Sequence, residues 1–355
     1  MKKHRIWIGI LIFAAILLLF AGGIGIYAQS NLNKINRVNK EEEVFVDPSS
    51  EDFEIDEELA ARIQSDSESE IEVVDPKDID WGDLNIPVVE DQDVINLLLI
   101  GQDRREGQGR QRSDTMIICS IDTRRDKIIL SSVMRDLYVP IPVYSDNRIN
   151  AAYQFGGMTL LDQVMEESLG IHIDGNIEVD FSGFINSLSA VGNLDIELNE
   201  AEAEYLNTHV SWVEQAGASG EGWSLKAGVN SMTPEQVLAY SRIRYVGNSD
   251  WERTDRQRRV LIAAFDKVKD QGITGITKMA DNILPNLTTD LTDMQIIGYI
   301  YTILANGITE IESYRIPVEG TYSCQTLSYG MEVLVPDLAA NSRALQEYIY
   351  GTEGE

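Results

Sequence analysis

The distribution of apolar residues divides the chain into three parts, and the first is an uncharged, mostly apolar run from Ile6 to Tyr27. As a helix, these 22 residues would be about 33 Å long at about 1.5 Å per residue, enough to cross a bilayer. A signal peptide has a shorter apolar core, and the Ala28 flank carries no clear cleavage motif. The pattern predicts a retained transmembrane anchor over residues 6–28. The basic start MKKHR predicts that residues 1–5 stay cytoplasmic and that the rest of the chain is extracellular.

The second part, residues 29–92, is strongly acidic. Between Glu41 and Asp93 there are 21 acidic residues and only two basic ones, Arg62 and Lys77. Such a composition buries little apolar surface and repels itself. It predicts an extended extracellular linker between the anchor and a folded domain.

The third part, residues 93–350, carries the apolar periodicity of a folded domain. Continuous or alternating apolar runs predict strands at 95–100, 115–121, 127–134, 194–198, 311–317 and 332–335. Helical periodicity predicts helices at 160–168, 181–191, 234–240, from about 250 to 269, 273–284, 294–304 and 337–350. This alternation predicts an α/β fold of three layers, α/β/α, with a central mixed sheet covered by helices on both sides.

Charge and cysteine content restrict the possible functions. The net charge of −29 argues against nucleic acid as a partner, because proteins that bind nucleic acid need a positive surface. Cys119 lies in the apolar run MIICSI and is predicted to be a buried free thiol. A disulfide with Cys324 in an oxidising compartment remains the alternative.

The stretch from Tyr240 to Arg259 reverses the sign of the chain, with six arginines and no lysine in twenty residues. Guanidinium groups bind phosphate or carboxylate bidentately, so this cluster predicts an anion site. A solvated helix face with ion pairs is the alternative. Arg242 and Arg244 share a face if the backbone there is extended, and Arg253, Arg256 and Gln257 share one helix face. Arg258 and Arg259 are expected to point elsewhere, as surface residues.

A second charged feature is the loop GQDRREGQGRQRSDT, which follows the first predicted strand. Asp103 and Asp114 stand at the two strand ends of this loop, and a third strand ends just before Arg135. Two carboxylates beside arginines suit a complex of Mg²⁺ with a diphosphate. A surface loop with internal ion pairs is the alternative. The chain shows no serine, cysteine or histidine centre, which favours phosphoryl transfer by positioning and charge stabilisation.

These motifs together resemble the LytR-CpsA-Psr family of membrane-anchored cell-wall enzymes. The resemblance rests on INLLLIGQDRR, RSDT, SSVMRDLYVPIP, RINAAYQFGG and YSRIRYVGNSDWERTDRQRR, in the order found in the family. It implies an α/β/α fold with an apolar channel for a polyprenyl chain. It also implies transfer of a phospho-glycopolymer, such as teichoic acid or capsular polysaccharide, from polyprenyl pyrophosphate to peptidoglycan. The muramic acid 6-hydroxyl would attack the sugar-side phosphorus, and polyprenyl phosphate would leave.

The resemblance also implies roles for individual residues. Asp103 and Asp114 match aspartates associated with Mg²⁺ (or Mn²⁺), and Asp250 is a candidate general base. The positions that match pyrophosphate-binding arginines are Arg105, Arg135, Arg242 and Arg244. Arg256 and Gln257 match an Arg-Gln pair of the family, and Arg112 and Arg253 join the predicted site from the same loop and helix. Asp103, Asp114, Arg135 and Asp250 form the predicted catalytic set.

The main alternative function is a non-catalytic module that holds polyprenyl pyrophosphate as a sensor or carrier involved in envelope regulation. A binder would return the lipid diphosphate intact, whereas an enzyme would turn it over. A transcriptional regulator is disfavoured by the acidity and the predicted outside topology. The sequence does not identify the glycopolymer or the acceptor strand.

Overall fold

The structure is a computed structural model. It describes residues 30–50, 55, 57–65, 72–82, 84–102, 104, 107–208, 223–243, 246–247 and 249–351. The predicted cytoplasmic tail and membrane anchor, residues 1–28, lie outside this part of the chain. Among the described residues, no helix combines the length and the apolar character that crossing a bilayer requires.

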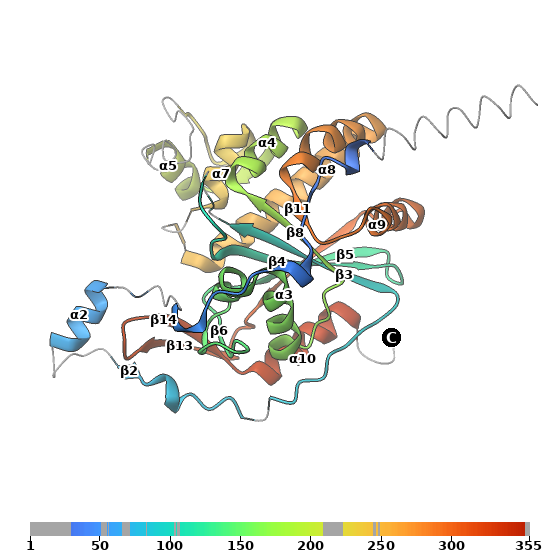
Figure 1. The fold of residues 1–355 in the computed structure, drawn as a ribbon. Helices are drawn as coiled ribbons and strands as arrows, with labels where there is room; N and C mark the ends of the chain where they lie inside the picture. Colours follow the sequence, from blue (N-terminus) through green and yellow to red (C-terminus); the bar gives the residue numbers. More distant parts are fainter. Residues whose placement is uncertain are drawn as a thin grey trace, which may run out of the picture.

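A central mixed sheet organises the domain, as the sequence predicts (Figure 1). In spatial order its described strands are β1 (Asn36–Arg37), β11 (Thr288–Thr289), β8 (Gly175–Asp180), β3 (Val94–Gln102), β4 (Ser113–Asp122), β5 (Lys127–Val133) and β12 (Glu310–Ile316). Strands β8, β3, β5 and β12 run in one direction, and β4 runs antiparallel between β3 and β5. The carboxyl ends of the four parallel strands therefore share one edge with the start of β4.

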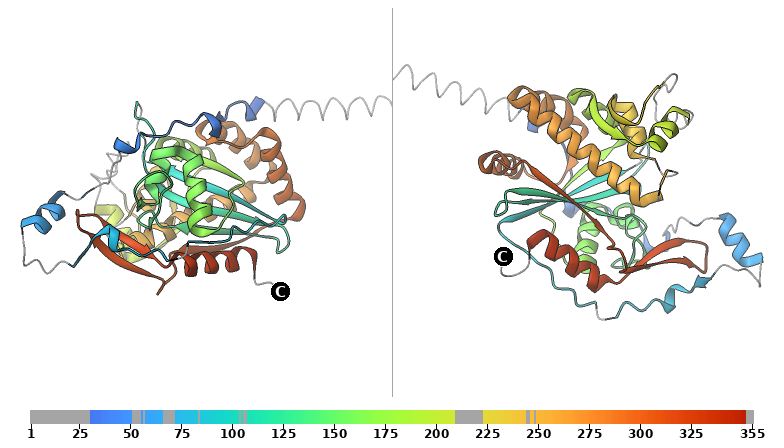
Figure 2. Two further views of the ribbon diagram at one scale, coloured as in Figure 1. Left: turned by 60° about the horizontal axis from the view of Figure 1, so that its bottom comes forward. Right: turned by 180° about the vertical axis from the view of Figure 1, so that it is seen from behind.

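Helices cover both faces of this sheet, which confirms the predicted α/β architecture (Figures 1 and 2). Helices α3 (Asn150–Leu169) and α10 (Leu338–Tyr350) pack on the face to which Leu98 and Ile100 point. Helices α8 (Ser249–Ile283) and α9 (Asp293–Asn306) pack on the face of Leu97. Because side chains alternate along a strand, the unbroken apolar run of β3 serves both cores.

A second apolar cluster lies beyond α8. It is built from α4 (Phe181–Val191), α5 (Glu200–Thr208), α7 (Pro234–Ser241) and the hairpin β9 (Leu194–Leu198) with β10 (Gly228–Met232). Thr233 caps α7 in a capping box with Gln236, and Pro234 stands in the first turn. The Thr233 cap is the one that the sequence predicts. The two helices predicted at about 250–269 and 273–284 are one continuous helix, α8.

The remaining described elements are short. They are α2 (Glu57–Ser65), β2 (Val73–Val74), β6 (Tyr138–Val139), β7 (Asn147–Arg148), β13 (Tyr322–Leu327), β14 (Glu332–Pro336), η1 (Lys40–Glu42), η2 (Pro48–Ser50), η3 (Pro76–Asp78) and η4 (Leu284–Asn286). Cys119 in β4 and Cys324 in β13 are both free thiols, so the disulfide alternative is not adopted.

The N-terminal segment from residue 30 to 50, here called the strap, differs from the predicted extended linker. Strand β1 pairs with β11 at the edge of the central sheet, and Leu32 and Ile35 are buried. Farther along the predicted linker, β2 pairs with β13, and the Trp81 indole donates a hydrogen bond to Asp146. The acidic composition conceals these contacts because the apolar and basic residues that make them are few and widely spaced.

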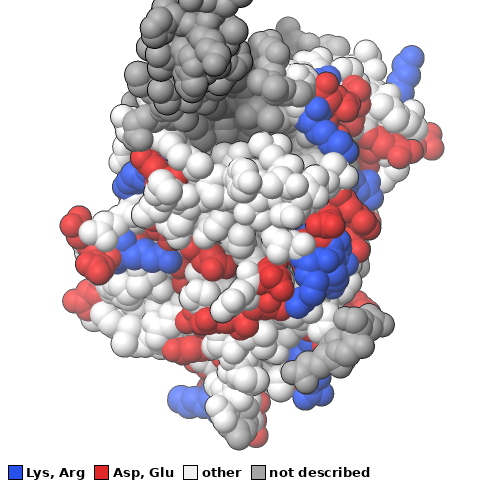
Figure 3. All heavy atoms as spheres, turned by 90° about the vertical axis from the view of Figure 1, so that its right-hand side faces the viewer, with Lys and Arg blue, Asp and Glu red and all other residues white. Residues whose placement is uncertain are grey.

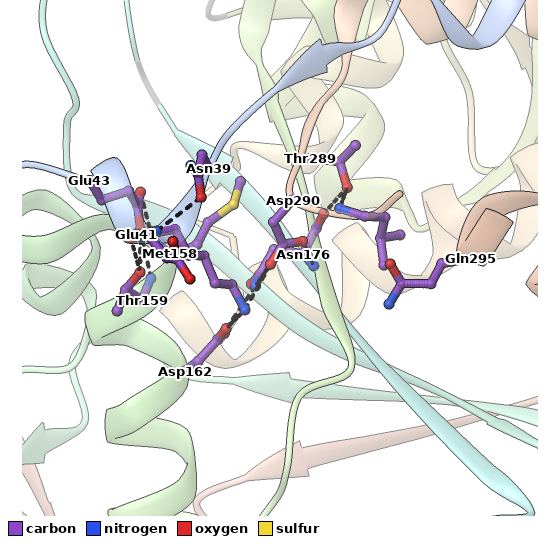
Figure 4. Close-up of polar contacts among 12 residues, drawn as sticks. Asn39, Glu41, Glu43, Met158, Thr159, Asp162, Asn176, Thr289, Asp290 and Gln295 are labelled. Atoms are coloured by element: carbon purple, nitrogen blue, oxygen red, sulfur yellow. Dashed lines mark hydrogen bonds and ion pairs between the residues drawn. The ribbon is translucent and has the colours of Figure 1, made fainter. Parts of the chain in front are cut away.

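A cluster of buried charges fastens the strap to the domain (Figure 4). Lys40 Nζ lies 2.5 Å from Asp162 Oδ2 and 2.7 Å from Asp290 Oδ2. The amide of Asn176 donates to both carboxylates, at 2.9 and 3.0 Å. Three distant elements, α3, β8 and the residue after β11, therefore converge on one strap lysine. Burial is the largest influence on Asp162 and raises the pKa of its carboxyl to about 6.

A second strap contact caps the part of α3 on which Asp162 lies. Helix α3 is kinked at Gly157, where φ is 70°, and a new helical start follows the kink. Glu43 accepts hydrogen bonds there from the backbone N–H of Met158 at 3.1 Å and of Thr159 at 2.8 Å. A carboxylate at this position satisfies helix-start donors and interacts favourably with the helix dipole.

Replacing Lys40 with methionine should therefore destabilise the protein in a pH-dependent way. Near pH 8 the loss should be about 2 kcal/mol, below the roughly 3–5 kcal/mol of fully buried pairs because Lys40 is partly exposed. The folded-state pKa of Asp162 is raised above its unfolded value, so its contribution to stability is present at low pH and is lost as pH rises through about 6. Near pH 5 the uncompensated carboxyl is protonated, and the loss should be smaller.

Denaturant unfolding of the full chain in detergent at the two pH values measures this difference. Asp162→Asn in both backgrounds is the matched control, since it removes the titrating group while keeping the side-chain shape. Equal losses near pH 5 and pH 8 would contradict the assigned role of Asp162.

Candidate active site

The candidate site lies at the edge of the sheet where β3 and β5 end and β4 begins. Asp114 is the second residue of β4, and Arg135 follows the end of β5 by two residues. Asp114 Oδ1 and Arg135 Nη1 form an ion pair 2.7 Å apart. The structure thus brings together two residues that the sequence analysis selected from separate strands.

A bulge in β4 sets the position of Asp114. Gly101 pairs with Thr115, but Gln102 pairs with Ser113, so Asp114 is the extra residue on its strand. Such bulges redirect a side chain away from the regular alternation. The close approach also favours glycine at position 101, because a Cβ there would lie 3.0 Å from the Thr115 Cβ and Thr115 would have to shift slightly. The local backbone, and not only the strand order, presents Asp114 at the edge of the sheet.

Asp136 holds two arginines at this edge. Its Oδ1 lies 2.9 Å from Arg148 Nη1 and its Oδ2 lies 3.5 Å from Arg135 Nε. Arg148 belongs to β7 and is 9% exposed. The sequence analysis did not select Arg148 or Asp136, although both stand in the motifs that carry the family resemblance. A carboxylate that is bonded to two guanidinium groups limits their motion and prepares the edge for an anion.

The arginines of the loop before β4 have different partners. Arg104 pairs with Asp180 at 3.3 Å, and Arg110 donates to the carbonyl oxygens of Gln154 and Val44. Arg112 Nη1 donates to Asn150 Oδ1 at the start of α3, at 3.4 Å. Arg110 therefore joins the loop to the strap, whereas Arg112 lies beside the Asp114 bulge and is half-buried.

Arg256, one of the predicted phosphate-binding arginines, is engaged by several protein groups. Its side chain is 1% exposed and forms a 2.8 Å ion pair with Glu202, which is also buried. It donates to the carbonyl oxygens of Ile243 and Val246, both at 3.1 Å, and pairs with Glu252. Arg256 thus holds the connection between α7 and α8, the segment on which Arg242 and Arg244 stand.

The other predicted residues of this region lie close to that connection. Arg242 ends α7 as its C-cap and is half-buried. Arg253 is 4% exposed on α8, and Gln257 is half-buried one residue beyond Arg256. Asp250 stands in the first turn of α8, and its side chain is outside the described part of the structure. Asp103, Arg105 and Arg244 also lie outside the described residues.

Arg258 is buried rather than a surface residue, which corrects the prediction. Its Nη1 donates to Ser132 Oγ on β5 at 2.7 Å, and its side chain faces the sheet. Arg315 on β12 stacks over the Trp251 ring, with Cζ 4.2 Å from the ring centre. Burial chiefly lowers the pKa of Arg258, and the positive charge of Arg315 lowers it further, while Asp255 opposes the shift. Arg259 is exposed and pairs with Asp255, as expected for a surface residue.

Two further arginines therefore lie near the carboxyl end of the sheet without having been predicted. Arg315 was missed because a single arginine in an apolar strand carries no pattern. Helical periodicity places Arg258 on a different side of α8 from Arg256, but it does not show that this side meets the sheet. A like-charge approach of this kind is unfavourable unless carboxylates or an anion compensate it.

Few described side chains at this edge could hold a metal ion. Within the described ranges, no group of three or more acidic, histidine or cysteine side chains is placed to hold a metal ion. Mg²⁺ needs only one or two protein carboxylates when phosphate oxygens supply the rest. The partly exposed carboxylate of Asp114 beside Arg135 is a donor of this kind.

Comparison with known proteins finds relatives that match most of the chain. The protein is 33% identical over 246 residues to the polyisoprenyl-teichoic acid–peptidoglycan teichoic acid transferase TagU of Oceanobacillus iheyensis, covering 66% of this chain and 71% of TagU. It is 26% identical over 274 residues to the regulatory protein MsrR of Staphylococcus aureus, covering 77% of this chain and 79% of MsrR.

The fold also matches solved structures. One is the LytR-CPS2A-psr family protein YwtF (TagT) with bound octaprenyl pyrophosphate lipid, at a TM-score of 0.54 and 22% identity. The match covers 73% of this chain and 91% of that protein. The sequence model of the LytR_cpsA_psr family matches residues 50–346. The chain therefore belongs to the LytR-CpsA-Psr family.

Proposed function

We propose that this protein is an extracellular, membrane-anchored phosphotransferase. It moves a phospho-glycopolymer, of the teichoic acid or capsular polysaccharide type, from a polyprenyl-pyrophosphate carrier to peptidoglycan. The observation that carries the proposal is the Asp114–Arg135 ion pair, which a bulge and Asp136 hold at the carboxyl edge of the sheet. The similarity to TagU, whose name states this type of transfer, supports the reaction class.

The anchor belongs to the same proposal. Residues 6–28 hold the protein in the cell membrane with residues 1–5 in the cytoplasm and the domain outside. This topology gives the enzyme access to a lipid-linked donor and to the wall acceptor. An extracellular domain is also not expected to bind nucleic acid.

The pyrophosphate is assigned to six arginines that match or adjoin the family motifs. These are Arg105, Arg112, Arg135, Arg242, Arg244 and Arg253. Guanidinium groups fixed by protein carboxylates before the substrate binds need little reorganisation in the transition state. Arg256, with its four protein contacts, is assigned to positioning the segment of Arg242 and Arg244, and Gln257 to the neighbouring face.

The reaction then proceeds as an in-line displacement at phosphorus. The acceptor hydroxyl oxygen of peptidoglycan forms a bond to the phosphorus attached to the sugar, and the bond from that phosphorus to the polyprenyl phosphate oxygen breaks. Asp250 takes the hydroxyl proton, and polyprenyl phosphate leaves with the bonding electron pair. Asp103 and Asp114 would hold Mg²⁺ (or Mn²⁺), which would supply charge compensation for the diphosphate.

The competing function is a sensor or carrier that binds polyprenyl pyrophosphate without turnover. Incubation of the full chain in vesicles with a lipid-linked glycopolymer and peptidoglycan distinguishes the two. Wall-linked polymer together with released polyprenyl phosphate supports the enzyme. Recovery of intact donor under conditions of demonstrated binding would support the carrier and refute the transferase.

Loss of the paired aspartates should reveal whether they act as one unit. Asp103→Asn and Asp114→Asn should each lower kcat/KM by roughly 100-fold, and the double variant should lose little more, because residues that share one ion are not additive. Transfer assays with Mg²⁺ titrated against a chelator measure this. Asp126→Asn, an exposed aspartate at the β4–β5 turn, is the control and should keep parent activity. Full activity in chelator would contradict the metal assignment.

The geometry of Arg135 should matter more than its charge. Arg135→Lys keeps the charge but removes the planar group that contacts Asp114 and Asp136, so kcat/KM should fall by about tenfold or more. Arg259→Lys tests the same change at an exposed arginine and should have little effect. Steady-state transfer kinetics of both variants provide the comparison. Equal behaviour of the two would show that Arg135 serves only as a surface charge.

Arg256 should behave as a structural residue. Arg256→Met leaves the Glu202 carboxylate buried and unpaired, which should lower the free energy of unfolding by roughly 3–5 kcal/mol. Adding Glu202→Gln should recover part of the loss, because the uncompensated charge is removed. Denaturant unfolding measures both variants. Parent-like stability of Arg256→Met, with only donor binding lost, would instead assign Arg256 to the pyrophosphate.

A further inference from the structure

Helix α9 has an outward face that is apolar along its whole length. The exposed side chains on this face are Met294 (77%), Ile297 (45%), Ile300 (49%), Tyr301 (71%) and Leu304 (60%). Their spacing of three and four residues places them on one side of the helix. The opposite side packs on the central sheet through Ile296, Tyr299 and Ile303. A helix that is apolar on both sides is normally covered on both sides.

Charge on this face is confined to its first residue. The single charged residue of α9 is Asp293, in its first turn, and its carboxylate is paired with Arg37 of the strap at 2.5 Å. Figure 3 faces this side of the molecule and shows a broad uncharged area, with Lys, Arg, Asp and Glu gathered at its margins. In a protein with a net charge of −29, an uncharged apolar area of this kind indicates an interaction surface.

The strap fixes where the chain enters the domain relative to α9. Strand β1 pairs with β11, and α9 begins four residues after β11 ends. The Arg37 side chain donates to the carbonyl oxygen of Leu291, and Lys34 pairs with Asp281 near the end of α8. In all three views of Figures 1 and 2, the first described residues lie on the same side of the molecule as α9. The entry of the chain and the apolar face are therefore neighbours.

The distance from the predicted anchor to this face is short. The anchor proposed above ends at residue 28, and Ser30 is the first described residue. Arg37 follows residue 28 by nine residues, and a segment of this length spans at most about 32 Å even in an extended chain. Since Arg37 contacts Asp293 directly, the start of α9 lies within that distance of the place where the chain leaves the membrane.

We propose that the outward face of α9 lies on the outer surface of the cell membrane, with its apolar side chains in the interfacial region of the bilayer. This inference rests on the anchor in the proposed function. An apolar helix face inserts parallel to the membrane plane by about 5–10 Å, and tyrosine favours the level of the headgroups, as Tyr301 would. A second copy of the chain is a poorer occupant. A stable protein interface uses about 20–30 residues a side, far more than this face offers.

The placement also orients the candidate site. Helix α9 leads into the start of β12, and Leu291 packs at Gly175, the start of β8. Both contacts lie at the amino ends of the parallel strands, whereas Asp114 and Arg135 lie near the carboxyl ends of β3 and β5. A nine-residue strand such as β3 is about 30 Å long, so the phosphate site lies toward the opposite end of the sheet from these contacts.

Spin labels on the full chain test this placement. Tyr301→Cys and Leu304→Cys are made separately in a Cys119→Ser, Cys324→Ser background, labelled, and reconstituted in vesicles of phosphatidylglycerol and phosphatidylethanolamine. Val229→Cys, on β10 and also well exposed at 72%, is the matched control. Power-saturation spectra give the ratio of collisions with oxygen to collisions with a water-soluble nickel complex. This ratio should be several-fold higher at both α9 positions than at position 229.

Each result distinguishes contact between α9 and the membrane from an alternative. Equal ratios at 229, 301 and 304 in vesicle-bound protein overturn the membrane contact but leave the proposed function intact. Dipolar broadening at 301 that disappears on dilution with unlabelled chain overturns it in favour of a second copy. Failure of the full chain to float with the vesicles overturns the anchor and the contact together, and transfer activity in detergent then tests the reaction separately.

An activity comparison gives an independent readout. Tyr301→Glu/Leu304→Glu should reduce transfer from a vesicle-embedded donor several-fold, while transfer from the same donor dispersed in detergent stays at the parent level. Equal activity of parent and variant with the vesicle donor would overturn a functional membrane contact.

Discussion

The placement of β4 between β3 and β5 is the constraint on which the candidate site depends. Because β4 runs antiparallel to two parallel neighbours, its first residues lie beside the last residues of both. The bulge at Asp114 then turns one carboxylate out of the regular pairing, next to the arginine that follows β5. The backbone hydrogen bonds of the sheet thus bring together two charged side chains that are 21 residues apart in the sequence.

The arginines of this acidic chain divide into two kinds according to their partners. Arg256 and Arg258 are buried and bonded to protein oxygens, so that each stabilises the connection or helix it crosses. Arg135 has carboxylate contacts at a partly exposed edge, where an anion can approach. Removal of a buried guanidinium would leave carbonyl and carboxylate groups without partners, which is unfavourable.

The strap fastens the first described residues of the chain to this organisation. Lys40 pairs with α3 and with the residue after β11, β8 joins the same two carboxylates through Asn176, and Glu43 caps the second part of α3. Figure 4 shows these contacts, which the strap makes within the short stretch from Asn39 to Glu43. The strap is therefore part of the domain that it precedes, and it is held by contacts of the fold rather than being a free linker.

The sequence by itself determined the elements whose patterns are local. The apolar runs of β3, β4 and β5, the Thr233 cap and the periodicity of α4 and α10 depend on neighbours in the chain, so the sheet and its covering helices were predictable. The family motifs also brought Asp114 and Arg135 together. Tertiary structure alone decided the burial of Arg256 against Glu202, because the two lie 54 residues apart. It likewise decided the docking of the strap and the exposure of one apolar face of α9, since amphipathic periodicity does not tell which apolar side of a helix meets the core.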